Sequence, residues 1–295
     1  MGYVDMSKLT FGLPAGSLQK TTLDIMKKAG FNIYVNERSY FPYIDDEEIE
    51  CILIRAQEIP KYTEEGVLDL GISGEDWITE TDADVIEAAD LTYSKQGLRP
   101  TKLVLAVPND SEINKVEDLQ GKKIATELVE VTRKFLSRNN VQAKVEFSWG
   151  ATEVKPPILV DAIAELTETG RSLKANNLRI LDTIMESTPR IIANKKSWED
   201  EWCRSKIEQI VTLVKGALMA EERVGLKMNV SKENLNKVLS LLPALRKPTV
   251  SDLYEEGWVA IETVIEEKKV RELVYQLKEA GAEGIIEYSL NKIIP

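Results

Sequence analysis

The sequence of 295 residues contains no histidine and only two cysteines. Without histidine, the chain cannot build a Ser-His or Cys-His nucleophile, and it lacks the commonest side-chain ligand for zinc. Cys51 and Cys203 lie far apart in the sequence, which gives no support for a disulfide framework. We expect both thiols to fill the core.

The sequence also lacks long apolar runs and an excess of positive charge. No run approaches 18 apolar residues, and the first residues lack a basic region followed by an apolar segment, so we expect a cytoplasmic protein that does not enter a membrane. The net charge is −11. Because affinity for a phosphate backbone needs clustered Lys and Arg, we expect no nucleic-acid partner.

What is present fits a globular α/β protein. Hydrophobic residues make up 43% of the chain and charged residues 29%, and the length allows two or three domains. The pattern predicts strands at residues 9–13, 31–35, 49–54 and 67–73, which alternate with helices at 18–29 and 56–65. This alternation is typical of βαβ units around a parallel sheet.

Polar turns follow three of these strands, at residues 14–17, at Arg55 and at residues 71–76. Ligands of open α/β sheets bind outside the carboxyl ends of the strands. A single glycine-rich turn is usually only a turn, but three at equivalent strand ends favour a ligand site.

The pattern restarts after residue 101. It predicts strands at 102–107, 122–126, 143–147 and 160–166 and a helix at 129–138, and strands at 178–185 and 190–194 that cross back to the first domain. This layout is similar to that of type II solute-binding proteins, whose ligand lies in the hinge cleft. A binding protein or sensor without chemistry is therefore the alternative hypothesis. A secreted receptor would need a signal peptide, and its fold would not require a phosphate loop.

The stretch at residues 160–178 is the most informative. It reads as a strand, a hydroxyl-and-glycine turn and a short helix with Ser172 as N-cap. Such a turn directs backbone N–H groups at a phosphate, Gly170 permits positive φ, and Thr169 and Ser172 add hydroxyl donors. Asp161 and Glu165 suit ribose hydroxyls or Mg²⁺. Spacing alone fits an ordinary strand-to-helix turn equally well.

Several segments resemble ATP phosphoribosyltransferase, the first enzyme of histidine biosynthesis. Glu165-Leu-Thr-Glu-Thr-Gly-Arg-Ser-Leu173, with Gly150-Ala-Thr-Glu153 before it, resembles the family's phosphoribosyl-pyrophosphate loop. Gly12-Leu-Pro-Ala-Gly-Ser-Leu18, Ile54-Arg-Ala-Gln-Glu-Ile-Pro60 and Asp69-Leu-Gly-Ile-Ser-Gly-Glu-Asp76 resemble segments that line its ATP cleft. The resemblance implies attack of adenine N1 of ATP on C1′ of phosphoribosyl pyrophosphate, with Mg²⁺ as cofactor.

The resemblance implies three sets of site residues. Phosphoribosyl pyrophosphate would be bound by Thr167, Glu168, Thr169, Gly170, Arg171 and Ser172. The residues closest to the chemistry would be Glu153, Asp161 and Glu165, and Asp161 and Glu165 could also contact Mg²⁺ held by the substrate phosphates. ATP would be bound by Gly16, Arg55, Gly71, Ser73, Gly74 and Asp76.

The sequence departs from the family pattern in three places. Many members carry Lys where Ala15 stands and Arg where Ser17 stands, so Arg55 or Lys20 would have to supply positive charge. The segment from Glu153 to Asp161 is one residue shorter than usual and lacks a glycine. Ser172 stands where threonine is common.

The C-terminal part follows a helix predicted at residues 198–222, which we interpret as a linker. Strands at 223–229, 249–253, 258–265 and 284–288 and helices at 231–241, with Ser231 as N-cap, and 267–280 give the order βαββαβ, which is ferredoxin-like. This module resembles the ACT-like regulatory domain of the long, histidine-inhibited form of the family, most clearly at Leu242-Pro-Ala-Leu-Arg-Lys-Pro-Thr249.

The resemblance also implies effectors and an assembly. L-histidine would bind near Asn229, Leu245, Thr249, Gly284 and Ser289, and AMP is a candidate ligand. A homodimer would assemble into a homohexamer. The predicted organisation is a type II periplasmic-binding-protein-like catalytic core, with domain I at 1–100 and 188–222 and domain II at 101–187, followed by a ferredoxin-like regulatory domain at 223–295.

Overall fold

The computed structural model describes residues 8–36, 38–94, 97–243 and 247–295, and these form two compact units. The first unit extends to Val211 without Lys28–Gly30, and the second joins those three residues to Thr212–Pro295. The boundary therefore falls inside helix α7 (Glu201–Ala220) and not after residue 222, where the sequence pattern predicts it. Each unit has its own hydrophobic core.

The first lobe of the first unit is built on a five-stranded sheet. The strand order is β4 (Ile49–Arg55), β1 (Leu9–Ala15), β5 (Leu70–Gly74), β12 (Pro189–Ala193) and β6 (Ile86–Asp90). β1 pairs in parallel with β4 and β5, but β12 runs antiparallel to both of its neighbours. The predicted parallel sheet is therefore correct for three strands, and the returning strand makes the whole sheet mixed.

The second lobe is built on another five-stranded sheet. Its order is β11 (Leu178–Ser187), β7 (Thr101–Pro108), β10 (Ala162–Thr167), β8 (Lys123–Thr126) and β9 (Lys144–Phe147). β7 lies between β11 and β10, and residues 103–107 are completely buried. Burying each of its Leu and Val side chains contributes about 1.5–3 kcal/mol, so this strand anchors the lobe.

Helices and shorter elements complete the two lobes. The first lobe contains α1 (Gln19–Ala29), α2 (Ile59–Glu64), α3 (Glu75–Thr81), α6 (Lys195–Glu199) and the small pair β2 (Ile33–Tyr34) and β3 (Tyr43–Ile44). The second lobe contains α4 (Val129–Arg138), α5 (Arg171–Ala175), and the 3-10 turns η1 (Val116–Leu119) and η2 (Thr152–Val154).

Several boundaries differ from the sequence predictions for local reasons. The helix expected at 56–65 begins only at Ile59, because Pro60 suits the first turn of a helix and cannot lie inside one. The helix expected at 198–222 is two helices. Asn194 caps the first through the N–H groups of Lys196 and Ser197, and Asp200, whose backbone is extended, ends it.

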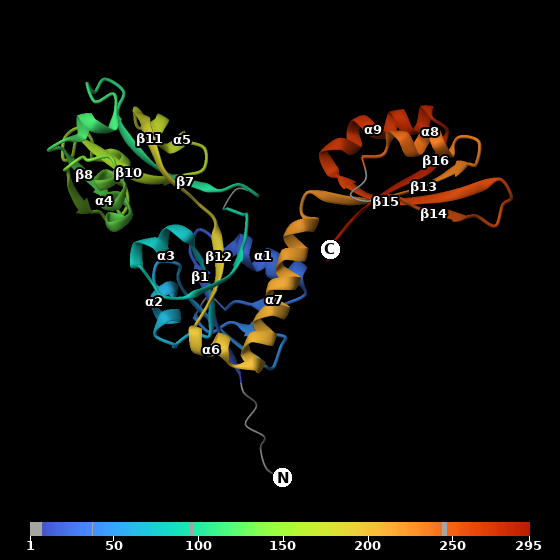
Figure 1. Cartoon of the computed structure of the whole chain (residues 1–295), viewed down its shortest axis with the longest axis horizontal. Coiled ribbons are helices and arrows are strands. Elements are labelled where there is room, and N and C mark those ends of the chain that lie inside the picture. Colours follow the sequence, from blue (N-terminus) through green and yellow to red (C-terminus); the bar gives the residue numbers. More distant parts are fainter. Residues whose placement is uncertain (1–7, 37, 95–96, 244–246) are drawn as a thin grey trace, which may run out of the picture. The chain divides into compact units, whose positions relative to one another are not determined.

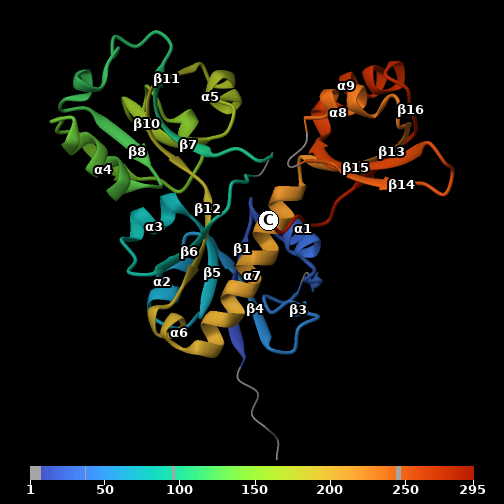
Figure 2. The same ribbon diagram turned by 45° about the vertical axis from the view of Figure 1, so that its right-hand side comes forward.

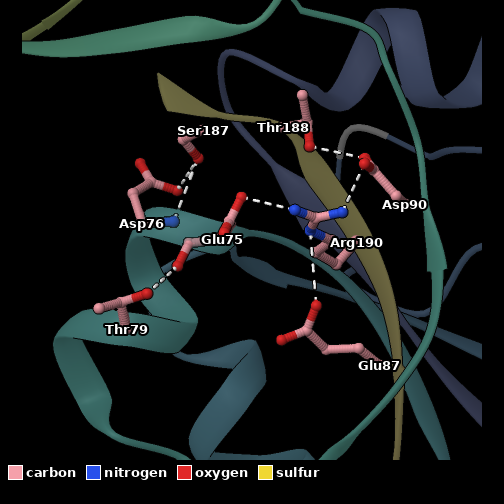
Figure 3. A network of polar contacts seen from close by, with 8 residues as sticks. All are labelled: Glu75, Asp76, Thr79, Glu87, Asp90, Ser187, Thr188 and Arg190. Carbon is pink, nitrogen blue, oxygen red and sulfur yellow. Dashed lines mark hydrogen bonds and ion pairs between the residues drawn. The ribbon is translucent and has the colours of Figure 1, made fainter. Parts of the chain in front are cut away.

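The chain passes between the two lobes twice, from β6 to β7 and from β11 to β12. Arg190 on β12 lies beside the second crossing (Figure 3). Its guanidinium contacts Glu75 at 2.6 Å, Asp90 at 2.6 Å and Glu87 at 3.6 Å. Burial disfavours the charged guanidinium, but the bonds to Glu75 and Asp90 raise its pKa overall. These contacts tie β12 to β6 and to the start of α3.

The second unit is a four-stranded antiparallel sheet with two helices. The strand order is β14 (Thr249–Asp252), β15 (Trp258–Glu266), β13 (Arg223–Ser231) and β16 (Ala282–Ser289). Helices α8 (Leu235–Leu241) and α9 (Glu267–Glu279) cover one face of this sheet (Figures 1 and 2). The predicted ferredoxin-like order is confirmed, but Asn234 rather than Ser231 precedes α8. No helix in the described ranges has the length and apolar character needed to cross a membrane.

We expect Arg190→Ala to lower the free energy of unfolding by about 1–3 kcal/mol, because it leaves Glu75 and Asp90 facing each other without their shared cation. Urea unfolding followed by circular dichroism measures the change. The control is Glu87→Gln, which removes only a 3.6 Å contact of a half-exposed carboxylate and should cost less than about 0.5 kcal/mol. Equal effects of the two substitutions would contradict a special role for Arg190.

Candidate functional site

A cavity of about 540 Å³ lies at the carboxyl ends of β1, β4 and β5 and is completed by the loop after β10. The first lobe contributes Ala15, Ser17, Leu18, Arg55, Ala56, Gln57, Gly74, Asp76, Trp77 and Tyr93. The second lobe contributes Thr101, Leu166, Thr167, Glu168, Thr169, Arg171 and Ser172, and the second crossing contributes Ser187 and Pro189. The structure thus brings the predicted loop and the predicted strand-end turns to one cavity.

The turn after β1 and the end of β4 lie side by side. Ala15 and Arg55 are register partners, so the two parallel strands end at the same level. Gly16 follows with φ of +100°, and a Cβ there would lie 3.2 Å from Nη1 of Arg55. The turn therefore packs directly against the guanidinium, which is exposed at the cavity wall.

Gly16 and two more of the predicted ATP residues support the cavity without lining it. Gly71 lies under α2, where an added Cβ would clash with the side chain of Ile59. Ser73 is buried, and its hydroxyl donates a 2.7 Å hydrogen bond to the carbonyl oxygen of Ala56. Ser73 thus holds the turn after β4, whose residues Arg55 and Ala56 line the cavity.

Asp76 is a buried carboxylate in the cavity wall. The hydroxyl of Ser187 donates to its Oδ1 at 2.8 Å and accepts its backbone N–H at 3.1 Å (Figure 3). Burial raises the pKa of Asp76, and the bond from Ser187 opposes this only in part. Gly74 makes room for the group, because a Cβ at that position would clash with Oδ1 of Asp76.

The loop after β10 has the backbone predicted for Gly170 but not the predicted cap. Gly170 has φ of +68° and is itself the N-cap of α5, and its N–H donates to the hydroxyl oxygen of Thr167 at 2.8 Å. The helix begins at Arg171, so the prediction of Ser172 as N-cap is wrong. The Ser172 hydroxyl instead donates to Glu153 at 2.5 Å.

Three glutamates lie behind the loop. Glu165 accepts a hydrogen bond from the hydroxyl of Thr152, next to Glu153. Burial raises the pKa of Glu165 and of Glu127, and the charges of Glu153 and Glu127 raise that of Glu165 further. Glu127 is a neighbour that the sequence analysis missed. None of these residues lines the cavity, so they form a second layer beneath the loop.

Asp161 does not belong to this group. It precedes β10 at the end opposite to the loop, and six residues of extended strand span about 20 Å. Its carboxylate accepts the N–H of Lys123 at 2.8 Å and lies 3.7 Å from the ammonium of Lys122. The assignment of Asp161 to ribose or Mg²⁺ therefore has to be corrected. This carboxylate joins β10 to β8.

The predicted effector residues are distributed over the second unit. A Cβ on Gly284 would lie 3.8 Å from Nδ2 of Asn229, so these two are neighbours. Thr249 lies on the edge strand β14, and Ser289 pairs with Val224 at the far end of β16. Leu245 lies outside the described residues. Gly284 also lines a cavity of about 560 Å³ beside α9.

Trp77, Tyr93 and Ser187 line the cavity but were not predicted. Tyr93 is fully buried, and its hydroxyl lies 2.8 Å from that of Thr22 on α1. Trp77 and Tyr93 follow β5 and β6, whereas Ser187 is the last residue of β11, far along the sequence. The Trp that follows the Gly-Glu-Asp turn is the one signal that could have pointed to the site.

Asp76→Asn should change how stability depends on pH. A carboxyl with a raised folded pKa holds its proton longer in the folded than in the unfolded protein, so wild-type stability falls as pH rises from about 4. The Asn variant lacks this fall. Its free energy of unfolding should therefore increase relative to that of the wild type as the pH rises. Denaturant unfolding from pH 4 to 8 measures it.

Asp118→Asn provides a control of opposite sign. The N–H groups of Asn114 and Lys115 lower the pKa of Asp118, so its stabilising effect is present above about pH 4 and is lost in acid. This variant should lose stability relative to wild type as pH rises. A pH-independent difference for Asp76→Asn would contradict the burial of a charged carboxylate at this position.

Comparison with known proteins identifies the family to which this fold belongs. Residues 55–216 match the family model of ATP phosphoribosyltransferase, and residues 220–292 match that of the HisG C-terminal domain. ATP phosphoribosyltransferase of Thermodesulfovibrio yellowstonii is 60% identical over 97% of this chain and 98% of its own. That of Chlorobaculum parvum is 59% identical over 97% of both chains.

A solved structure extends the likeness to the backbone. A chain of the ATP phosphoribosyl transferase (HisG:HisZ) complex from Thermotoga maritima is 28% identical, with a TM-score of 0.60. The match covers 70% of this chain and 98% of the other. Together with the full-length relatives, these findings show that the chain belongs to the ATP phosphoribosyltransferase family, in the long form that carries a C-terminal domain.

Proposed function

We propose that phosphoribosyl pyrophosphate binds at the loop of residues 167–172 and that ATP binds across the ends of β1, β4 and β5 in the same cavity. The family establishes the reaction, in which the 5-phosphoribosyl group is transferred to N1 of ATP as the first step of histidine biosynthesis. Family membership also argues against the alternative of a receptor without chemistry. The observation that carries the proposal is the convergence of both predicted segments on one cavity.

The reaction makes modest demands on acid and base groups. The lone pair of adenine N1 forms the new bond to C1′ while the bond from C1′ to pyrophosphate breaks, and pyrophosphate leaves with the bonding electrons. N1 carries no proton that must first be removed, so a chain without histidine can perform the step. What the protein must supply is orientation, which can recover roughly 7–11 kcal/mol of the barrier.

The 5′-phosphate is assigned to the loop because of its backbone. The left-handed Gly170 turns the loop tightly, and Thr169, with its hydroxyl, and Arg171, with its guanidinium, line the cavity, whereas the hydroxyl of Ser172 donates to Glu153. Helix α5 has only five residues, so its dipole adds little. Amide, hydroxyl and guanidinium groups are therefore the main phosphate ligands.

Arg55 is proposed to bind the phosphates of ATP. Its side chain is exposed in the cavity and forms no ion pair with the residues that the structure describes. It stands beside Ala15 and Ser17, where many family members carry Lys and Arg. One guanidinium held against the Gly16 turn would take over part of the role of those two cations.

Mg²⁺ is proposed to enter with the substrate phosphates. Within the described ranges, no group of three acidic or cysteine side chains is arranged to hold a metal ion. Asp161 is bound to lysines far from the loop, and Glu165 is bound by Thr152. The protein residues thus do not fit a preformed metal site, and we assign no step to the ion.

Gly170→Val should raise KM for phosphoribosyl pyrophosphate about tenfold, because a β-branched residue is strained at positive φ and shifts the loop. The assay follows absorbance with ATP, phosphoribosyl pyrophosphate, Mg²⁺ and pyrophosphatase, and in the wild type it requires both substrates. Gly121→Val is the matched control. Gly121 has φ of +73° with nothing within 4 Å of an added Cβ, so it suffers similar strain away from the cavity.

The two variants separate binding from folding. If both unfold at similar denaturant concentrations and only Gly170→Val shows the raised KM, the loop binds this substrate. An unchanged KM in folded Gly170→Val would remove the assignment. Wild-type protein that releases no pyrophosphate from the two substrates would overturn the proposed use of the cavity altogether.

We propose further that the second unit binds L-histidine and that binding slows the enzyme by favouring one arrangement of the protein. Support comes from its match to the HisG C-terminal domain and from the neighbouring Asn229 and Gly284. The predicted residues Thr249 and Ser289 lie away from this pair, which agrees with a site completed by another copy in a homodimer or homohexamer. AMP remains a candidate second ligand, and the cytoplasm the proposed location.

Thr249→Arg should abolish inhibition by histidine and leave uninhibited turnover within about twofold of wild type, because the bulky cation lies on an exposed edge strand of the second unit and Thr249 does not line the cavity. Initial rates over a histidine titration measure this. Val250→Arg on the same strand is the control, since its side chain faces the opposite side of the sheet. Wild-type enzyme that ignores millimolar histidine would end the regulatory proposal.

A further inference from the structure

Helix α4 of the second lobe begins without a capping side chain of its own. Its N-cap is Leu128, a buried apolar residue that cannot accept a hydrogen bond from the first turn. The first N–H groups of a helix have no partner within the helix. In most helices a Ser, Thr, Asp or Asn at the N-cap satisfies one of them.

The missing acceptor comes from the other lobe. Glu80, on α3 of the first lobe, accepts the N–H of Glu130 on one carboxylate oxygen and that of Val131 on the other, both at 3.0 Å. A carboxylate at a helix N-terminus also interacts favourably with the helix dipole. One side chain of the first lobe thus completes the start of a helix in the second.

Two further contacts join the same helices. Lys134, one turn along α4, lies 3.1 Å from the carboxylate of Asp82 at the end of α3. Trp77, one turn before Glu80 on α3, packs against the core of the second lobe and also lines the cavity. α3 and α4 lie beside each other in both views (Figures 1 and 2). The cavity wall at Trp77 is therefore joined to the second lobe both by the packing of Trp77 itself and by the hydrogen bonds of Glu80.

We propose that Glu80 is a positioning residue that latches the two lobes together around the cavity. It does not line the cavity and touches neither substrate site. Its bond to Glu130 is exposed and its bond to Val131 is only partly buried, so the latch is strong enough to bias closure and weak enough to release. The proposal rests on the proposed placement of both substrates in this cavity.

The latch has a kinetic signature that a substrate contact lacks. The apparent dissociation constant of a ligand rises in proportion as the fraction of closed protein falls. Both proposed substrates bind in a cavity whose walls come from both lobes. Loss of the latch should therefore raise the KM values of both substrates by a similar factor. Saturating substrates restore the closed form, and kcat is then preserved.

Glu80→Ala tests this directly because it removes both acceptor oxygens. Glu80→Gln keeps one acceptor oxygen for the N–H groups of α4. We expect KM for ATP and for phosphoribosyl pyrophosphate to rise together, about tenfold in the Ala variant and less in the Gln variant, with kcat within about twofold. The matched control is Glu64→Ala. Glu64 accepts the N–H of Asp84 at 3.1 Å, which is the same kind of bond confined to the first lobe.

A distance measurement separates the latch from loss of the site. Spin labels at Lys61→Cys and Ser137→Cys, both exposed, report the separation of α2 and α4 in a Cys203→Ser background. Without substrates, Glu80→Ala should show a longer and broader distance distribution than Glu64→Ala, and both substrates together should restore it. If Glu80→Ala loses its folded circular dichroism signal, Glu80→Gln carries the test.

The outcomes distinguish the latch from the substrate assignments. A rise of KM for one substrate only, or unchanged KM values and distances in the folded variant, overturns the latch. If Gly170→Val leaves KM unchanged while Glu80→Ala shifts both KM values and the distances, the latch stands and the loop assignment fails. Equal effects of Glu80→Ala and Glu64→Ala also overturn the proposal, since they show only a general loss of stability.

Discussion

The arrangement of the first unit depends on the ion pairs that the guanidinium of Arg190 forms with Glu75 and Asp90. A chain that leaves one sheet, builds another and returns must fix the points of departure and return, and this residue lies on the returning strand. It binds carboxylates from the strand before the departure and from the first turn of α3. The ends of β1, β4 and β5 can face the loop after β10 only while these elements stay in register.

Binding two polyanions is a demanding task for a protein with 49 acidic and 38 basic side chains. The structure limits this conflict by pairing several carboxylates with hydrogen-bond donors or lysines, both in the cavity wall and outside it. Asp161 is bound by lysines, Glu165 by a threonine hydroxyl and Asp76 by Ser187. The cations Arg55 and Arg171 are exposed in the cavity. The local balance at the site thus differs from that of the whole chain.

Local sequence patterns predicted most strands, the ferredoxin-like unit and the positive φ of Gly170, because these depend on neighbours in the chain. They did not predict α3, because its first residues were interpreted as part of a Gly-Glu-Asp turn. They also did not predict β6, because this strand has little apolar character. The position of Asp161 depends on the direction of β10, which a motif does not reveal. Tyr93, Trp77 and Ser187 reach the cavity only through the two crossings, a non-local effect.

Gly74 and Asp76 set a limit on how the enzyme can be altered. No side chain fits at residue 74 while the carboxylate of Asp76 occupies its present place, so residue 74 can change only together with residue 76. Libraries that seek a different nucleotide preference by randomising one cavity position at a time will therefore find no replacement for Gly74. Gln57 and Thr101 also line the cavity, and neither side chain is packed against a glycine. These two positions therefore offer the more accessible route to altered specificity.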